Sequence, residues 1–436
     1  MSPPGRSLLL RGGRVIDPAS GRDERTDVLV SGSRVEAVAP GLAARDEGEV
    51  LDVGGWLVTP GLVDPHVHFR EPGQEHKETI ATGAAAAAAG GYTTVCAMPN
   101  TDPVIDSPAA VRSVLDRSGA AGAARVRPIA AATEGSAGER ATDAAALADA
   151  GAVALSDDGL PIATAELLAE VLERAEESGL VVADHCEDRS LSEGGAVFET
   201  LAERLGVGGI PADAESVAVE RDLEVLERIG GRLHLCHLST ARSIELVRRA
   251  KADGLPVTAE VTPHHLVLTA RAVELAGADA KMNPPLATDE DREAVRSALG
   301  DGTADCVATD HAPHAASEKD GGLEAAPFGI VGLETAFGLL HTELVLPGEL
   351  SLEVLIERMT VGPARAFGLE AGRLEPGAPA DVAVFALEEE WTVDPTRFLS
   401  RSRNTPFAGW PLVGRPVVTV VGGRIVHDAR RGTGPQ

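Results

Sequence analysis

The sequence is short of basic residues, cysteine and lysine, and each shortage narrows what the protein can do. Lysine and arginine together number 39 against 67 acidic residues, which gives a formal net charge of −28 at pH 7. A chain of this charge repels phosphate backbones and anionic lipids, so neither nucleic acid nor a membrane is expected as a partner. An anionic substrate would therefore need a local basic residue.

Cysteine occurs only four times, at positions 96, 186, 236 and 306, and no two cysteines form a CxxC pair. Each stands alone in an apolar, strand-like run. This pattern favours buried free thiols in a reducing cytoplasm over disulfides, and it argues against a zinc site built from sulfur. Lysine occurs only at positions 77, 251, 281 and 319, so arginine supplies nearly all the positive charge, as in chains with a GC-rich coding bias. Each arginine is therefore judged by its position.

Long apolar runs are also missing. The three leucines before Arg11 fall far short of the ~7–15-residue apolar segment of a secretory signal. The alanine-rich run 84–89 lacks the ~20 strongly apolar residues of a membrane span. We therefore expect a cytoplasmic protein.

The length of 436 residues, with 44% hydrophobic and 24% charged residues, indicates a folded chain with one large and one smaller domain. Both ends of the chain consist of short β segments broken by Gly, Ser and Asp turns. They also share a near-repeat, GGRVID at 12–17 and GGRIVHD at 422–428. We expect residues 1–60 and 366–436 to form one discontinuous, small β-sandwich domain.

Between the two ends, apolar strand-like runs alternate with helical patterns, which is typical of α/β proteins with a parallel sheet. Residues 165–177 place their leucines and valine on one helical face, and another helix begins at Thr240. Eight such units predict a closed (β/α)8 TIM barrel over residues 61–365. The eight strand-like runs are 62–67, 93–98, 126–131, 152–155, 180–183, 233–236, 257–261 and 306–309.

Histidine or aspartate stands at five predicted strand ends, where a barrel of this kind assembles its active site. His66 and His68 point to the same side of their strand, because strand side chains alternate, and can share one metal ion. Each of these residues alone is more often a core histidine or a helix-capping aspartate, but their joint occurrence predicts a metal site. The other strand ends supply Asp157 or Asp158, His185, His237 and Asp310.

Imidazole and carboxylate ligands without thiolate suit Zn²⁺, with Mn²⁺, Co²⁺ or Fe²⁺ as alternatives. Four histidines and two carboxylates exceed the needs of one tetrahedral hydrolytic zinc, so we expect two ions that share a bridging carboxylate and a bridging hydroxide. Zinc lowers the pKa of bound water to ~7, and a second ion can polarise the carbonyl under attack. A carboxylate beside the hydroxide can then carry the proton.

A series of motifs runs along the predicted barrel: VTPGLVDPHVHFREPG (58–73), GGYTTVCAMPNT (90–101), SDDG (156–159), DHCED (184–188), CHLST (236–240), VTAEVTPHHL (257–266), KMNPPL (281–286), ATDHAPH (308–314) and APFGIVGLET (326–335). With these motifs the chain resembles the amidohydrolase superfamily, and specifically the class I bacterial dihydroorotases. The resemblance implies a barrel with a small β-sandwich built from both chain ends. It also implies two zinc ions, held by His66 and His68, by His185 and His237, by a bridging Asp158, and by Asp310, which is in addition the catalytic acid/base.

The identity of the bridging residue is open from the residues alone, since Asp157 and Asp158 are adjacent. The family's spacing to His185 favours Asp158. Related hydantoinases use a carboxylated lysine as the bridge, but no lysine lies between Lys77 and Lys251. The resemblance therefore implies that an aspartate takes this place.

Arg70 stands two residues past the second histidine and can offer a planar, two-pronged donor to a carboxylate. A hydantoinase, whose substrates carry no such carboxylate, has little use for it. The composition of the segment 311–329 predicts a mobile active-site loop. The adjacent pair His264 and His265, after the seventh predicted strand, is expected to be structural. The resemblance implies that substrate is held by His68, Arg70, Asn100, Asn283 and His314 and by the backbone amides of Phe328 and Gly329.

The function that the resemblance implies is the reversible cyclisation of N-carbamoyl-L-aspartate to L-dihydroorotate in pyrimidine synthesis. Two alternatives stay open: a related cyclic amidase such as a hydantoinase or allantoinase, and a non-catalytic scaffold for aspartate transcarbamoylase. The complete set of candidate ligands argues against the scaffold. A homodimer and an association with aspartate transcarbamoylase are partner hypotheses that the sequence does not decide.

Overall fold

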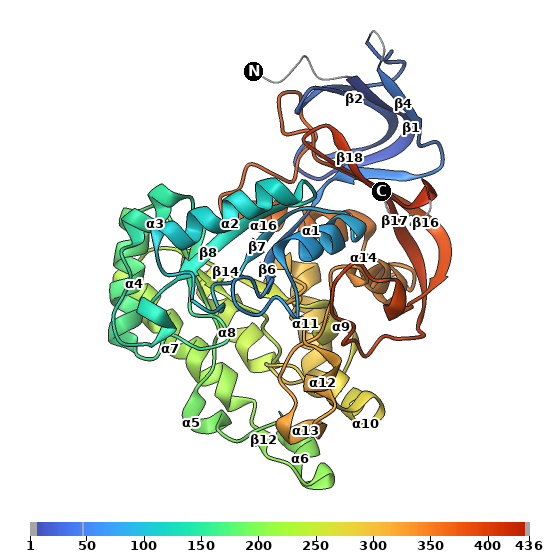
Figure 1. The fold of residues 1–436 in the computed structure, drawn as a ribbon. Helices are drawn as coiled ribbons and strands as arrows, with labels where there is room; N and C mark the ends of the chain where they lie inside the picture. Colours follow the sequence, from blue (N-terminus) through green and yellow to red (C-terminus); the bar gives the residue numbers. More distant parts are fainter. Residues whose placement is uncertain (1–6, 46–47, 432–436) are drawn as a thin grey trace.

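Two eight-stranded sheets organise the computed structural model, which describes residues 7–45 and 48–431 (Figure 1). One sheet is parallel and forms a helix-covered barrel, and the other is built from both ends of the chain and sits at one end of the barrel. The predicted α/β fold is therefore confirmed. The outermost parts of the predicted small domain, residues 1–6 and 432–436, lie outside the described residues.

The barrel strands follow one another around the sheet in chain order. They are β6 (Leu62–Val67), β7 (Tyr92–Ala97), β8 (Arg125–Ala131), β9 (Ala154–Ser156), β10 (Val181–Asp184), β13 (Leu233–Leu235), β14 (Val257–Val261) and β15 (Cys306–Val307). The barrel closes where Val67 forms a parallel bridge with His311 and the backbone N–H of His68 donates to the His311 carbonyl at 2.8 Å. The apolar strand side chains are buried, as expected for a parallel sheet covered by helices.

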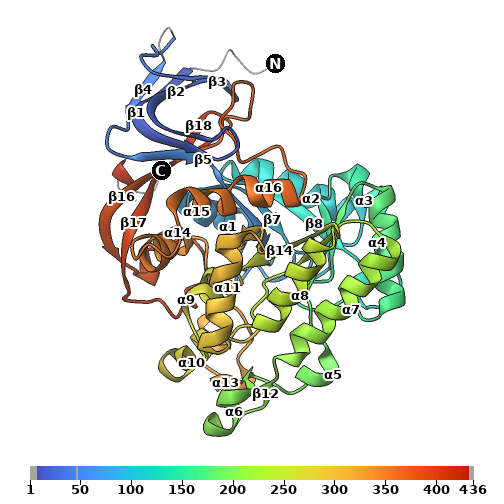
Figure 2. The ribbon, with the colours of Figure 1, turned by 180° about the vertical axis from the view of Figure 1, so that it is seen from behind.

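Helices between the strands cover the outside of the barrel (Figure 2). The predicted helix 165–177 is α4, and the leucines of its expected inner face are buried. The predicted start at Thr240 is also observed, since its side chain accepts the N–H of Ser243 and caps the helix. The covering helices between the strands are α1 (Ile80–Ala89), α2 (Pro108–Ala121), α3 (Ala144–Ala150), α4 (Ala165–Glu177), α7 (Asp213–Ile229), α8 (Ala241–Ala252) and α11 (Asp289–Asp301). After the last barrel strand follow α14 (Ala336–Leu340), α15 (Leu352–Met359) and α16 (Val361–Ala366), and the end of α16 packs against residues of the barrel interior.

Shorter elements extend from the end of the barrel that is remote from the small domain (Figure 1). The predicted active-site loop, residues 311–329, carries two of them, α12 (Ala316–Lys319) and α13 (Gly322–Ala325). The others are α5 (Arg189–Ser192), β11 (Val197–Phe198), α6 (Glu199–Leu205), β12 (Gly209–Ile210), α9 (Pro263–Val267) and α10 (Arg271–Ala276). These elements belong to the loops that follow β10, β14 and β15.

The sheet of the small domain draws strands from both ends of the chain, as predicted. Its order is β18-β17-β16-β5-β1-β2-β3, with β4 paired to β1, so β1 and β18 share one sheet without being neighbours. Leu8 and Val28 from one side of this sheet pack with Val382 and Val418 from the other in a single core, which requires the sheet to curve around it. The strands are β1 (Ser7–Asp17), β2 (Arg22–Ser31), β3 (Arg34–Ala39), β4 (Glu49–Asp52), β5 (Leu57–Pro60), β16 (Val382–Thr392), β17 (Pro411–Val421) and β18 (Arg424–Asp428).

The strands of this sheet lie within residues 1–60 and 366–436, the segments that we propose as the small domain. Among the described residues, no helix combines the length and the apolar character that crossing a membrane requires. All four cysteines are free and buried, as the sequence predicts.

Candidate metal centre and active site

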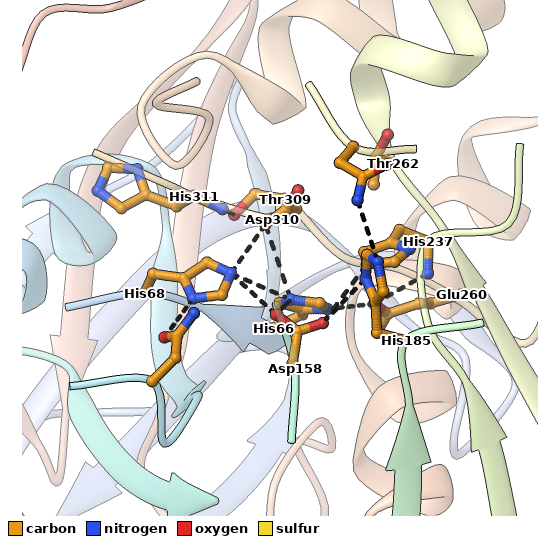
Figure 3. Close-up of polar contacts among 12 residues, drawn as sticks. His66, His68, Asp158, His185, His237, Glu260, Thr262, Thr309, Asp310 and His311 are labelled. Carbon is orange, nitrogen blue, oxygen red and sulfur yellow. Dashed lines mark hydrogen bonds and ion pairs between the residues drawn. The ribbon is translucent and has the colours of Figure 1, made fainter. Parts of the chain in front are cut away.

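The six candidate ligands converge at the carboxyl ends of the barrel strands (Figure 3). His66 lies in β6 and His68 follows it, and the other four side chains come from the residues just after their strands. All six are buried. The four are Asp158 after β9, His185 after β10, His237 after β13 and Asp310 after β15.

The first group of ligand atoms comprises both histidines of the HxH motif and the last aspartate. The Nε2 atoms of His66 and His68 are 3.3 Å apart. Oδ1 of Asp310 lies 3.1 Å from Nε2 of His68 and 3.7 Å from Nε2 of His66. Because metal–nitrogen and metal–oxygen bonds are ~2.0–2.2 Å long for zinc, three atoms at these separations can surround one ion.

The second group comprises the histidines that follow β10 and β13. Nδ1 of His185 lies 3.0 Å from Nε2 of His237. Oδ1 of Asp158 lies 3.6 Å from the first of these nitrogens and 3.5 Å from the second. This group therefore also has the separations that one ion needs.

Asp158 stands between the two groups, with one carboxylate oxygen directed to each (Figure 3). Its Oδ2 lies 3.4 Å from Nε2 of His66 and 3.4 Å from Nε2 of His68. Its Oδ1 is buried and has no hydrogen-bond partner among the described residues, which is costly for a carboxylate unless a cation binds it. Asp157 accepts hydrogen bonds from the backbone N–H, at 3.0 Å, and the hydroxyl of Thr133 instead. The geometry therefore favours Asp158 as the bridging residue.

Both carboxylates of the centre are held in their charged form. Burial alone would raise the pKa of Asp158, but the charge of His66 and the polar contacts with His185 and His237 lower it well below its usual value. Burial would also raise the pKa of Asp310, but hydrogen bonding to His68 and the charges of the surrounding histidines together lower it. Cys236 lies close to His66 and Asp158, and burial raises the pKa of its thiol well above the usual value.

Side chains behind the centre orient the histidines. Glu260 of β14 accepts a hydrogen bond from Nδ1 of His66 at 2.6 Å, so Nε2 of His66 faces the centre. Its other oxygen contacts His234 at 3.0 Å. In the same way Glu187 contacts Nε2 of His185 at 3.0 Å, so Nδ1 of His185 is the ring nitrogen that faces the centre. The sequence interpretation missed both glutamates, although a single charged residue inside the buried run VTAEV could have marked Glu260.

Three of the site residues have a left-handed backbone. Among the described residues, the non-glycine residues with positive φ are Arg70 (59°), Ser136 (50°), His237 (36°) and Asp310 (46°). Such conformations cost of order 1–3 kcal/mol and persist where the surroundings enforce them, often at functional sites. Here they turn the chain sharply just after a strand and direct the side chain over the barrel.

The predicted substrate-binding residues all line one cavity of about 300 Å³ above the metal ligands. Asn100 also orients a ligand, since its Oδ1 lies 2.9 Å from Nδ1 of His68. His314 approaches the carbonyl of Phe328 at 2.7 Å. The lining includes His68, Arg70, Asn100, Asn283, His314, Phe328 and Gly329.

Arg70 is the buried positive charge of this cavity. Its Nε donates to the Pro313 carbonyl at 3.2 Å, and within the described part of the chain it forms no ion pair. Burial lowers its pKa to about 10, against the opposing charges of Asp310 and Asp158, so it stays charged at neutral pH. A buried cation without a counter-ion is costly, which makes a ligand carboxylate its natural partner.

His264 and His265 lie outside both groups of ligand atoms. The ring nitrogens of His265 are engaged by the Thr262 hydroxyl at 2.8 Å and by the Pro284 carbonyl at 3.0 Å. Burial lowers its pKa to about 4, so it is neutral. These contacts favour the structural role expected for His265, and the role of His264 stays a prediction.

Comparison with known proteins covers nearly the whole chain. A family model described as dihydro-orotase-like matches residues 55–243. The dihydroorotase of Anaeromyxobacter sp. (strain K) is 53% identical over 97% of this chain and 98% of its own length. That of Pelotomaculum thermopropionicum is 49% identical over 97% of this chain and 99% of its own. The chain belongs to the dihydroorotase family, within the amidohydrolase superfamily.

Solved structures related to this dihydroorotase-family chain have the same fold. L-hydantoinase (dihydropyrimidinase) from Arthrobacter aurescens superposes with a TM-score of 0.85 and 26% identity, covering 97% of this chain and 96% of that one. Dihydropyrimidinase from Brevibacillus agri NCHU1002 gives a TM-score of 0.82 at 24% identity, covering 97% and 95%. The barrel with a second domain from both chain ends is thus common to these proteins.

Proposed function

We propose that the protein is a zinc-dependent cyclic amide hydrolase that interconverts N-carbamoyl-L-aspartate and L-dihydroorotate. One observation carries the proposal: two groups of nitrogen and oxygen ligands, joined by Asp158, lie under a cavity whose wall holds the unpaired charge of Arg70. Relatives that are about half identical over nearly the whole chain are named dihydroorotases.

The donor set fits two divalent ions, and Zn²⁺ suits its imidazoles and carboxylates best. His66, His68 and Asp310 would hold one ion, His185 and His237 the other, with Asp158 shared. When bound, the ions supply a hydroxide at neutral pH and polarise the carbonyl under attack. The buried, unpartnered Oδ1 of Asp158 supports this assignment without reference to the relatives.

The remaining steps belong to side chains of the chain itself. Arg70 binds the carboxylate that both substrate and product carry, and Asn100, Asn283 and His314 orient the ring amide. In the hydrolytic direction, Asp310 takes the proton of the attacking water and delivers it to the amide nitrogen that leaves. In the closing direction, it takes a proton from the carbamoyl nitrogen and delivers it to the carboxylate oxygen that leaves as hydroxide, and a further proton from solvent turns this hydroxide into water.

Arg70 favours this substrate over the carboxylate-free rings of a hydantoinase. A decisive experiment measures turnover of L-dihydroorotate, hydantoin, dihydrouracil and allantoin by the purified protein, with metal content measured on the same sample. We expect L-dihydroorotate to be consumed preferentially by protein with about two zinc ions per chain. Preference for a ring without a carboxylate would replace this proposal by the cyclic amidase, and fully loaded protein without any turnover would favour the scaffold.

A cytoplasmic location belongs to the same proposal, and the four buried, free cysteines support it. A homodimer and an association with aspartate transcarbamoylase stay predictions. Size measurements on the protein alone, and on its mixture with the transcarbamoylase, check both.

A further inference from the structure

Three of the four lysines of the chain gather around the loop that follows β15. The Nζ atom of Lys77 lies 3.1 Å from Oε1 of Glu318 in this loop. Lys281 and Lys319 are buried between this loop and the one that follows β14. Only Lys251 lies elsewhere, paired with Asp305 at 2.6 Å just before β15 begins.

Lys281 reaches from the loop after β14 into the loop after β15. Its ammonium group lies 2.5 Å from the carbonyl oxygen of Leu323, 3.2 Å from that of Glu324 and 2.7 Å from that of Ala326. Its Nζ also lies 4.5 Å from the centre of the Phe328 ring. The Lys281 side chain therefore holds both the end of α13 and Phe328, a residue of the cavity wall.

Lys319 makes the opposite connection, from α12 back to the loop after β14. Its ammonium group lies 3.0 Å from the carbonyl oxygen of Ala278 and 2.8 Å from that of Pro327, with that of Lys281 at 3.4 Å. Among the described residues, neither Lys281 nor Lys319 has a carboxylate within ion-pair distance. Carbonyl oxygens therefore take the place of counter-ions for both buried charges.

The two segments that these lysines join both contribute residues to the wall of the substrate cavity. Asn283 follows Lys281 by two residues, and Phe328 and Gly329 follow Pro327 directly; all three line the cavity. The backbone N–H of Gly329 also donates to the carbonyl of Lys281 at 2.9 Å. A shift of either loop would break hydrogen bonds that join the two segments.

We propose that Lys281 and Lys319 form a reciprocal clamp that positions Phe328 and Gly329 against Asn283 and thereby sets how tightly the cavity holds its substrate. The inference rests on the proposed function, in which these wall residues contact the substrate. Both lysines are positioning residues. Their ammonium groups can direct three donors to carbonyls on different sides, which a planar guanidinium cannot do. This accounts for lysine at positions 281 and 319, in a chain whose other basic residues are almost all arginine.

The test compares Lys281→Met and Lys319→Met with the control variant Lys251→Met. Lys251 is also hydrogen-bonded, but it does not line the cavity. We expect the KM for L-dihydroorotate to rise about tenfold in the two clamp variants, with kcat changed less than about threefold, since uniform binding is lost. Amide hydrogen exchange of residues 315–329 should accelerate by at least about tenfold while the barrel strands keep their rates. Lys319→Arg should not restore the wild-type KM, and Lys251→Met should change none of these values.

Unchanged KM and unchanged exchange in both clamp variants would overturn the proposal. Exchange that accelerates equally in the barrel strands would also overturn it, because the lysines would then support the fold as a whole. Should the variants not fold, acetylation of the native wild-type protein decides: we expect Lys281 and Lys319 to react at least about tenfold more slowly than Lys77 and Lys251. Equal rates at all four lysines would contradict the clamp.

Exchange and acetylation need no substrate, so they separate the two proposals. A protein that does not turn over L-dihydroorotate, but whose clamp variants loosen residues 315–329 alone, keeps the clamp and loses the proposed function. A protein that turns over L-dihydroorotate with unaltered KM and exchange in the variants keeps the function and loses the clamp.

Discussion

Adjacent residues at a strand end can have different roles, and their hydrogen bonds distinguish them. Asp157 is engaged by Thr133, whereas Asp158 faces four histidines. This pair offers a matched comparison. We expect Asp158→Asn to lose at least about 100-fold in zinc affinity, together with activity, because both groups of ligand atoms lose an anionic oxygen. Asp157→Asn should retain two ions, as measured by metal analysis after dialysis. Equal metal loss in both variants would contradict the assignment of the bridge.

Arg70 is predicted to contribute through substrate binding. Replacing it with alanine removes two charge-assisted hydrogen bonds to the substrate carboxylate, each worth roughly 1.5–3 kcal/mol. We therefore expect Arg70→Ala to raise the KM for L-dihydroorotate by at least about 30-fold. Arg70→Lys keeps a point charge without the planar guanidinium, so its KM should lie between that of the wild type and that of Arg70→Ala. Initial rates over a range of substrate concentration check this, and an unchanged KM in Arg70→Ala would remove Arg70 from the role.

Glu260, which accepts a hydrogen bond from the candidate ligand His66, is expected to make the stability of the fold depend on pH in the acid range. Burial would raise its pKa, but the charge of His66 and hydrogen bonds from His234 and His66 outweigh it and lower the pKa to about 2, below the usual value of 4.5. A carboxyl group with a lowered pKa stabilises the fold above pH 4.5, and this stabilisation is lost as the pH falls towards 2. The difference corresponds to on the order of 3 kcal/mol.

A comparison of Glu260→Gln with the wild type tests this effect in metal-depleted protein, by urea unfolding at pH 7 and at pH 3. The wild type should lose more stability than the variant between these two values, since the Glu260 carboxyl takes up a proton there in the unfolded chain but not in the folded one, and the variant has no such group. Parallel losses in the two proteins would show that Glu260 does not carry the charge assigned to it.

At the scale of secondary-structure elements, a helix holds the loop that carries a ligand. Glu215 of α7 accepts the N–H and hydroxyl of Ser239 at 2.9 and 2.6 Å, and those of Thr240 at 3.0 and 2.8 Å. Ser239 lies two residues after His237, the candidate ligand that follows β13. The buried carboxylate thus connects α7 to the start of α8 and fixes the loop between β13 and α8.

Removing this carboxylate leaves buried donors without partners, at roughly 1–3 kcal/mol each. We expect Glu215→Ala to lower the free energy of unfolding by about 3–5 kcal/mol, as measured by urea unfolding. Glu220→Ala is the matched control, because Glu220 lies on the same helix with its side chain 53% exposed. A loss in Glu215→Ala no larger than in this control would contradict the bracing role.

The sequence predicts the elements best where the apolar pattern is uninterrupted. The runs 62–67 and 257–261 coincide with β6 and β14, and 165–177 coincides with α4. The run 306–309 is longer than β15, which ends at Val307, because Thr309 instead donates its N–H and hydroxyl to Asp64. Such a contact joins residues far apart in the chain, so no local pattern announces it.

The same limit applies to the site. Ligand candidates could be named because each stands at the end of an apolar strand run, and the fold brings strand ends together. The glutamates that orient these ligands, Glu187 and Glu260, could not be named from the sequence, because they reach the histidines only through tertiary contacts. The same holds for Lys281 and Lys319 of the clamp. The short elements between β10 and α7 were also not predicted, because residues 189–210 show no sustained period.

At the scale of the whole molecule, the small domain has a core of its own, but Ile16, Leu57 and Phe385 of its strands pack into the core of the barrel. Every candidate ligand lies in the barrel. The ligands come from five strand ends, so bound ions would connect segments from both ends of the barrel sequence. Anything that binds the folded chain and not the unfolded one stabilises it by mass action. The centre should therefore contribute to global stability as well as to activity.

Metal depletion tests this contribution. We expect chelated protein to lose activity and to melt several degrees lower, since ions at about 1,000 times their dissociation constant stabilise the folded state by ~4 kcal/mol. Adding Zn²⁺ should restore both properties together. In Asp158→Asn, chelation should shift the melting temperature much less, because the variant binds little metal to begin with. If thoroughly chelated wild-type protein kept its activity and its melting temperature, the convergence of six buried ligand side chains would need an explanation other than metal binding.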